Sequence, residues 1–174
     1  MAEDIFLKLT GITGESQDHK HKGEINVVSW SWGATQTGSM HVATGGGVGK
    51  VNVRDISITK RVDTATPALW QAMCVGKHID TATLTVRKAG EHPLEFLVIT
   101  LTSVLVTGQD TGGGRGDELM TETMTLNFRE FDIKYTEQRA DGGPGLSSEF
   151  AFDIALNAPS QSQIGAPAQR GGRL

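Results

Sequence analysis

Apolar and polar residues alternate with a period of two along much of this chain, and this pattern constrains its fold more than any other feature. Side chains of a strand point alternately to the two faces of a sheet, so the pattern marks strands with one buried face. Glycine-rich stretches separate many of the alternating segments, as expected for turns between short strands. The segments are 5–9, 24–33, 51–62, 81–88, 94–107, 122–138 and 149–156. The sequence therefore predicts a mainly β protein.

One segment has a helical pattern instead, "DTATPALWQAMCVGKH". Thr66 is a candidate N-cap, Pro67 suits the first helical position, and Gly76 suits the C-terminal cap. These signals predict one short helix over about residues 66–76. The side chains expected to face the core from this helix are Leu69, Trp70 and Met73.

Length and composition indicate one domain. A chain of 174 residues with 37% hydrophobic content can bury one substantial core. We predict a single domain over residues 1–157, folded as a flattened β-barrel or sandwich of two antiparallel sheets with one short helix. Residues 158–174 are rich in Pro, Gly, Ser and Gln, which predicts a disordered tail.

The strand pattern around "SWSWG" assigns its side chains to two faces. Val28, Trp30 and Trp32 alternate on one face, which we expect to be in the core. Ser29 and Ser31 then lie on the other face, where small polar side chains suit a wetted surface. A carbohydrate-binding β-sandwich, with Trp30 and Trp32 as an exposed aromatic platform, is the alternative interpretation.

The stretch "HVATGGGVGK" resembles a phosphate-binding loop at first sight. With Gly49 and Lys50 as the final pair of that motif, the first required glycine falls on Thr44, and Val51 replaces the hydroxyl residue that binds Mg²⁺. The segment that follows alternates like a strand, whereas the motif requires a helix. We therefore expect residues 38–50 to form an extended surface loop and predict no nucleotide or other cofactor.

Two groups of residues could carry chemistry, and neither is complete. Asp18, His19 and His21 lie close in sequence, but a catalytic zinc site needs about three protein ligands and no third histidine has a suitable spacing. Cys74 and His78 could form a dyad, but nothing supplies an orienting third group. We predict no metal site and no enzyme activity; a hydrolase that uses one of these groups is the remaining alternative.

Charge and apolar runs exclude two classes of partner. The net charge is −4 and the basic residues are scattered, which argues against nucleic-acid binding. No apolar run approaches the roughly 20 residues that span a bilayer, so we expect no membrane insertion. The first residues, "MAEDIFLKLT", lack the features of a signal peptide. The single cysteine predicts folding without a disulfide, and we expect synthesis in the cytoplasm.

Several long segments, in this order, resemble the haemolysin-coregulated protein (Hcp) family, which forms the inner tube of the bacterial type VI secretion system. The resemblance extends from about Asp4 to Leu156. The segments that carry it are "EDIFLKLTGITGESQDHKHKGEINVVSWSWG", "GKVNVRDISITKRVDTATPALWQAMCVGKHI", "ATLTVRKAG", "FLVITLTSVLV" and "LNFREFDIKYTEQRADGGPG".

This resemblance implies a structural protein that assembles with copies of itself into hexameric rings, which stack into a tube. It implies sheath, spike and baseplate proteins as further partners, and small effector proteins that are carried and stabilised in the ring lumen. It also implies export in the folded state, without a signal peptide, from the bacterial cytoplasm to the medium or a target cell.

The resemblance also suggests roles for particular residues. The strand that matches residues 25–32 contributes to the lumen in the family, so Ser29 and Ser31 are expected to face the lumen and Ser31 to contact cargo. The glycine-rich loop corresponds to an extension that meets neighbouring subunits or the next ring. The residues suggested for ring assembly and stacking are Gly45, Gly46, Gly47, Gly49, Lys50, Asp110, Arg115 and Asp117.

Overall fold

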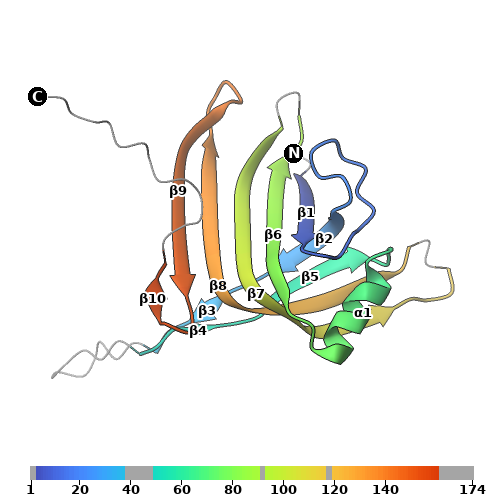
Figure 1. The fold of residues 1–174 in the computed structure, drawn as a ribbon. Helices are drawn as coiled ribbons and strands as arrows, with labels where there is room; N and C mark the ends of the chain where they lie inside the picture. Colours follow the sequence, from blue (N-terminus) through green and yellow to red (C-terminus); the bar gives the residue numbers. More distant parts are fainter. Residues whose placement is uncertain (1–2, 38–48, 91–92, 117–118, 161–174) are drawn as a thin grey trace, which may run out of the picture.

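The computed structural model describes residues 3–37, 49–90, 93–116 and 119–160. These residues form an eight-stranded sheet, a two-stranded sheet and one α-helix (Figure 1). In chain order the elements are β1 (Glu3–Leu9), β2 (Ile25–Ser31), β3 (Ala34–Thr35), β4 (Asn52–Val53), β5 (Ile56–Arg61), α1 (Thr66–Val75), β6 (Ile79–Lys88), β7 (Leu94–Gly112), β8 (Thr121–Gln138), β9 (Pro144–Asp153) and β10 (Ala158–Pro159).

Six strands of the large sheet close into a barrel, in the order β8–β5–β2–β1–β6–β7, because β7 also pairs with β8. Every pair in this ring of strands is antiparallel. Closure pairs the backbone N–H and C=O groups that an open sheet would leave unpaired at its edges. The predicted fold class is confirmed, with β3 and β4 as the second, smaller sheet.

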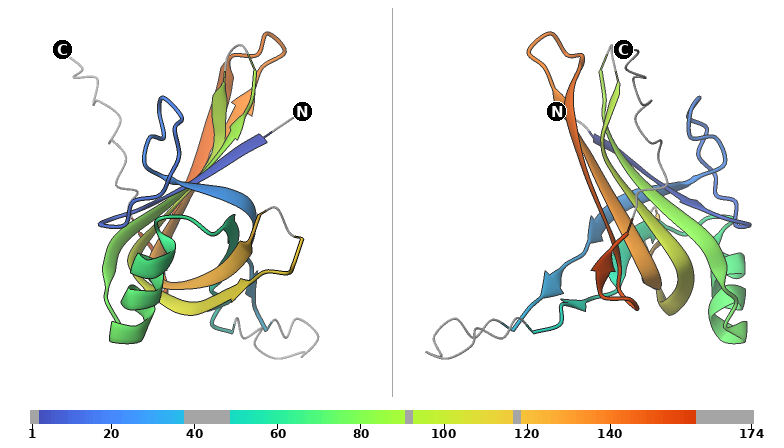
Figure 2. Two further views of the ribbon diagram at one scale, coloured as in Figure 1. Left: turned by 90° about the vertical axis from the view of Figure 1, so that its right-hand side faces the viewer. Right: turned by 60° about the vertical axis from the view of Figure 1, so that its left-hand side comes forward.

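The long strands β7 and β8 belong to the barrel and also extend beyond it. The first part of β8, residues 121–126, pairs with β5, and its later part, residues 130–138, pairs with β9. Along β8 the alternation changes phase between Phe128 and Phe131, and Ser103 on the neighbouring β7 has a φ of 54° near this point. The sheet of β8 and β9 therefore continues past the closed part of the molecule (Figures 1 and 2).

The core fills the barrel with the apolar face of each strand, as alternation predicts. On β5, for example, Ile56 and Ile58 are buried while Ser57 and Thr59 are half-buried on the other face. The strands and helix enclose one cluster of aliphatic and aromatic side chains. Its least exposed large apolar members are Leu7, Ile25, Ile56, Ile58, Leu69, Ile79, Leu84, Ile99, Leu101, Met124 and Leu126.

The helix begins at Thr66, but not with the predicted cap. Ala65 holds the N-cap position, and its methyl side chain makes no capping hydrogen bond to the first turn. Asp63 holds the chain in place just before the helix, because its Oδ1 accepts a hydrogen bond from the Ala65 N–H (2.9 Å). The Thr66 hydroxyl accepts a bond from the Asp63 N–H and donates one to Glu122. Gly76 closes the helix with a φ of 63°, as predicted.

Only one side of α1 packs on the barrel. Leu69 is fully buried and Met73 is half-buried against the core. Trp70, in contrast, has 39% of its surface exposed, so its prediction as a core residue was wrong. Successive helical residues point about 100° apart, so Trp70 points toward solvent although its neighbour Leu69 points into the core.

A β-bulge in β2 overturns a second core prediction. Val27 pairs with Lys60 and Ser29 pairs with Thr59, so Val28 is an extra residue in β2 with no partner in the ladder. A bulge shifts the alternation by one position. Val28 is therefore exposed (53%), while Val27 and Trp30 pack against the core.

Arg54 and Asp55 join the small sheet to the barrel. β4 pairs with β3 in the small sheet, and β5 enters the barrel. The Arg54 N–H donates to the Gly33 carbonyl (3.0 Å) where the two strands leave the barrel. The small sheet projects away from the barrel as an arm (Figure 2).

The predicted tail begins at Ala158, and its first residues pair with β9. Ala158 and Pro159 form β10 opposite Asp153 and Phe152. The remainder of the predicted tail, residues 161–174, lies outside the described residues.

Candidate functional site

Hydroxyl side chains form a continuous surface on the outer face of β2, β5 and β8. Directly paired residues of antiparallel strands lie on the same face of the sheet. Ser29 on β2 is paired with Thr59 on β5, which is paired with Thr123 on β8. A second row has the same organisation. The two rows, which we call the hydroxyl wall, comprise Ser29, Thr59 and Thr123, and Ser31, Ser57 and Thr125.

The hydroxyl wall faces solvent because the opposite faces of the same strands carry the core. Ser29 and Ser31 are exposed, and the four wall residues on β5 and β8 are half-buried. Thr59 and Thr123 lie within hydrogen-bond distance, with 3.3 Å between their Oγ1 atoms. This surface matches the orientation predicted for Ser29 and Ser31.

Asp55 organises one edge of the hydroxyl wall. Its Oδ2 accepts a hydrogen bond from the Thr107 hydroxyl (2.6 Å), and its Oδ1 accepts one from the Asn127 amide (2.7 Å). The Thr107 and Thr125 hydroxyls lie 3.0 Å apart. Asp110 is paired with Thr123 and adds a negative charge near the other row. Short hydroxyls that donate and accept hydrogen bonds can contact many polar protein surfaces without requiring one partner geometry.

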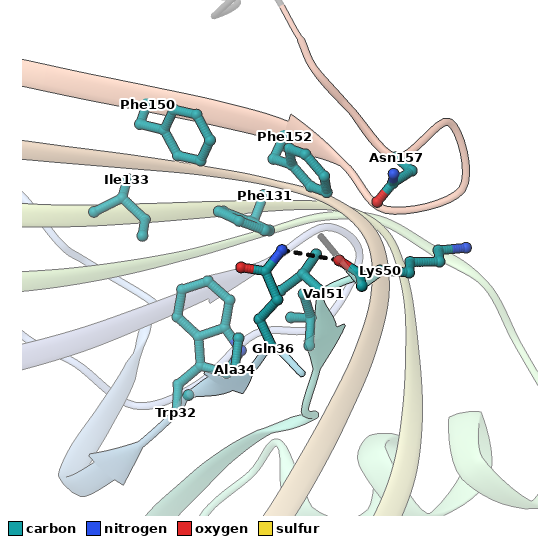
Figure 3. A pocket seen from close by; sticks show the side chains of 13 residues that line it. Trp32, Ala34, Gln36, Lys50, Val51, Phe131, Ile133, Phe150, Phe152 and Asn157 are labelled. Carbon is teal, nitrogen blue, oxygen red and sulfur yellow. Dashed lines mark hydrogen bonds between the residues drawn. The ribbon is translucent and has the colours of Figure 1, made fainter. Parts of the chain in front are cut away.

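An open aromatic groove lies where the arm leaves the barrel (Figure 3). Its volume is about 860 Å³. Trp32 packs its ring edge against Phe131 at 4.9 Å between ring centroids, and its indole N–H donates to the Arg54 carbonyl (2.9 Å). The Gln36 side-chain amide donates to the Gly49 carbonyl across the arm (2.9 Å). The arm and the sheet of β8 and β9 thus form the two sides of one apolar surface.

The assembly residues suggested by sequence fall in different places. Gly49 and Lys50 line the aromatic groove. A Cβ atom at Gly49 would collide with Thr37, so the close approach of the two arm segments requires glycine there. Asp110 and Arg115 are exposed at the far end of the β7–β8 hairpin. The other suggested residues, Gly45, Gly46, Gly47 and Asp117, lie outside the described residues.

Asp18 and His21 have structural roles, whereas His19 is exposed. Both oxygens of Asp18 accept hydrogen bonds from Arg87, at 2.6 and 3.0 Å. These bonds hold the pKa of Asp18 well below its usual range, although burial acts in the opposite direction. His21 stacks on Phe6 with 4.2 Å between ring centroids, and its Nδ1 lies 2.9 Å from a Glu24 carboxylate oxygen. Over residues 3–37, 49–90, 93–116 and 119–160, no cluster of three or more potential ligands could hold a metal ion.

Sequence reasoning missed four of the six wall residues. The signal is present in "ISIT" and "TETMT", where hydroxyls alternate with buried side chains. It could not be interpreted before the strand order was known, because Thr59 and Thr123 are far apart in the chain.

No helix among the described residues is both long and apolar enough to cross a membrane.

The fold and these surfaces define a small closed β-barrel protein with a projecting arm, a hydroxyl-lined outer face and an aromatic groove. The sequence profile described as "Type VI secretion system effector, Hcp" matches residues 6–135. Protein hcp1 of Pseudomonas aeruginosa is 51% identical over 159 residues, which cover 90% of this chain and 98% of that protein.

Solved structures agree with this assignment. Hcp1 from Salmonella typhimurium is 37% identical, with a TM-score of 0.76 over 92% of this chain and 100% of that one. A structure of a type six secretion system protein is 27% identical, with a TM-score of 0.87 over 91% of this chain and 100% of that one. The chain belongs to the Hcp family of type VI secretion system proteins, a family of structural components.

Proposed function

We propose that this chain is the subunit of a hexameric ring that stacks into the inner tube of a type VI secretion system, with the hydroxyl wall lining the lumen. The observation that carries the proposal is the extent of this wall over three neighbouring strands. A channel that carries different proteins needs a polar surface that holds none of them tightly, and short hydroxyls supply it. The Hcp relatives support the tube role.

The proposal includes the partners that such a tube requires. Small effector proteins occupy the lumen before export, and sheath, spike and baseplate proteins contact the assembled tube. The subunit is exported in the folded state from the bacterial cytoplasm. The carbohydrate-binding alternative needs exposed indole faces, whereas Trp30 and Trp32 are both half-buried and pack against the core.

The first test is the native mass of the purified wild-type protein, measured by native mass spectrometry at micromolar concentration. We expect the mass of a hexamer of 18.6 kDa chains. A stable monomer at this concentration would contradict the ring, because a tube of stacked rings requires ring closure first.

The second test places a charge on the hydroxyl wall. Ser31→Glu is expected to leave the ring mass unchanged and to reduce recovery of a co-expressed effector by about tenfold, which corresponds to about 1.4 kcal/mol of binding free energy. Ring symmetry repeats the charge in every subunit, so the effector meets a ring of carboxylates. Pull-down of the tagged effector from intact rings measures this loss.

Ser147→Glu is the matched control, because Ser147 is an exposed serine on β9, away from the hydroxyl wall. It should leave effector recovery within about twofold of wild type. Equal recovery with Ser31→Glu and with wild type would show that the hydroxyl wall is not the effector surface.

A further inference from the structure

The inner face of the β8–β9 sheet is apolar beyond the barrel and is not fully covered. Phe131 is paired with Phe152, and Ile133 with Phe150, so these four side chains share a face. All four line the aromatic groove (Figure 3). Phe150 retains 52% of its surface exposed, although it lies on the same side of the sheet as the buried core.

The apolar surface continues along the two strands past the groove. Tyr135, two residues after Ile133 on β8, is 47% exposed, and Leu146 on β9 is 82% exposed. From Leu146 to Phe152 the strand extends roughly 20 Å at about 3.4 Å per residue. Small-molecule sites are concave and bury most of their ligand, whereas this apolar surface is open along its length, so it has the form of a protein interface.

A second exposed apolar surface lies elsewhere on the barrel. Val28, Leu119 and Met120 are 53%, 54% and 52% exposed and border the same depression, and we call them the apolar knob. The bulge in β2 turns Val28 outward, and the Val62 N–H donates to the Met120 carbonyl (3.0 Å), which ties the end of the β7–β8 loop to the strand-β5 region. The knob is therefore held on the barrel and is not a loose loop tip.

The knob and the groove lie on opposite sides of the molecule. In Figure 1 the end of the β7–β8 hairpin lies at the right, and β9 with the β3–β4 arm lies at the left. A contact between two different surfaces on opposite sides is heterologous, and repeated contacts of this kind close into a ring when the rotation permits it. An isologous contact, in contrast, would require one surface to face its own copy.

Charge at the borders is mixed. Lys50 lines the groove, and both Glu15 and Arg61 border the knob depression with exposed side chains. When the knob of one copy enters the groove of another, attraction between Lys50 and Glu15 is offset by repulsion between Lys50 and Arg61, so the apolar side chains carry the contact. Such border charges contribute mainly to the orientation and rate of association.

We propose that the apolar knob of one copy docks into the aromatic groove of the next copy, and that this contact closes the ring. The inference rests on the proposed function, and it names the surfaces that join neighbouring subunits. Met120 and Leu119 supply the side chains that enter, and Phe150 and Trp32 supply the walls that receive them.

The first experiment charges each surface separately. Met120→Lys and Phe150→Lys each place a cation in the apolar contact and are expected to convert the ring to 18.6 kDa monomers. Val75→Lys is the matched control, because Val75 is 69% exposed on α1, away from both surfaces, and its variant should keep the ring. Native mass spectrometry gives the assembly state, and far-UV circular dichroism shows that each variant is folded.

The second experiment tests which surfaces touch. In a Cys74→Ser background, chains with Met120→Cys and chains with Phe150→Cys are co-expressed and oxidised. Disulfide-linked dimers are expected in the mixture and not in either variant alone, because the contact joins two different surfaces. This readout also holds if a lysine variant fails to fold.

The possible results separate the contact from the ring itself. A wild-type ring that persists in both lysine variants, without a cross-link in the mixture, would overturn the knob-and-groove contact and leave the tube proposal standing. Dimers formed by Met120→Cys chains alone would overturn it as well, because they indicate an isologous contact. A monomeric wild-type protein would overturn the ring and, with it, this inference.

Discussion

Replacing Lys60 with methionine is expected to lower the free energy of unfolding by about 3–5 kcal/mol, because it leaves buried carboxylates without their cation. Lys60 is completely buried, and its Nζ lies 2.6 Å from oxygens of both Asp63 and Glu122. It also donates to the Arg61 carbonyl (2.9 Å) and the Thr66 hydroxyl (3.3 Å). The midpoint of urea unfolding, at fixed protein concentration, measures the loss.

The effect should depend on pH through Glu122. Burial raises the pKa of Glu122, but hydrogen bonds from Lys60, Thr66 and Thr111 and the charge of Lys60 lower it more, so the net shift is downward. A carboxyl group with a lowered pKa contributes stability above its unfolded pKa of about 4.5, and this contribution is lost as the pH falls through the folded pKa. The difference between wild type and Lys60→Met should therefore shrink below about pH 4.5.

Lys77→Met is the control for this variant, since Lys77 is exposed beyond the end of α1. It should change the free energy of unfolding by no more than about 0.5 kcal/mol. A loss below 1 kcal/mol with Lys60→Met at neutral pH would contradict the assignment of Lys60 as the cation that compensates Glu122 and Asp63.

The strands could be predicted because burial on one face leaves a direct record in the sequence. Ile56 and Ile58 alternate with Ser57 and Thr59 whatever the strand pairs with, so the period alone locates the strand and its inner face. The bulge at Val28, in contrast, could not be predicted from the sequence of β2. An extra residue in one strand is defined by the partner strand, and the partner of β2 is not apparent from its own sequence.

Predicting the candidate site requires knowledge of the pairing between distant segments, even more than predicting the bulge does. Resemblance to a known family suggested Ser29 and Ser31, but their neighbours Thr59 and Thr123 follow from the strand order β2–β5–β8. The buried pair of Lys60 and Glu122 was missed for the same reason. A charged residue inside an alternating segment looks like a solvent-facing position until its partner is found 62 residues away.

The aromatic groove could not be predicted from the sequence pattern either. Alternation shows that one face of a strand is apolar, but it does not show which part of the protein covers that face. Phe150 and Phe152 have the alternation of core residues, and Phe152 is half-buried while Phe150 is largely exposed. Strand β9 is not one of the six strands of the closed barrel. Its apolar face therefore extends beyond the core, although its sequence pattern is that of a core strand. Exposure of this kind indicates an interface more directly than any motif in the chain.

Trp32→Ala and Trp70→Ala should differ by about 2 kcal/mol or more in their effect on stability, although both remove an indole predicted to be buried. Trp32 packs against Phe131 and Phe128, at 4.9 and 5.7 Å between ring centroids, and its N–H donates to the Arg54 carbonyl. Its removal opens the base of the arm and is expected to cost about 3 kcal/mol. Trp70 is 39% exposed on α1, so its loss should cost about 1 kcal/mol or less.

Trp32→Phe separates ring packing from the hydrogen bond. Phenylalanine keeps an aromatic ring beside Phe131 but cannot donate to the Arg54 carbonyl, so we expect a loss of about 1–2 kcal/mol, between wild type and Trp32→Ala. Urea unfolding of the three variants at one protein concentration measures all these differences. Equal losses for Trp32→Ala and Trp70→Ala would show that the aromatic cluster does not anchor the arm, because a cavity at its base would then cost no more than a change on the outer side of the helix.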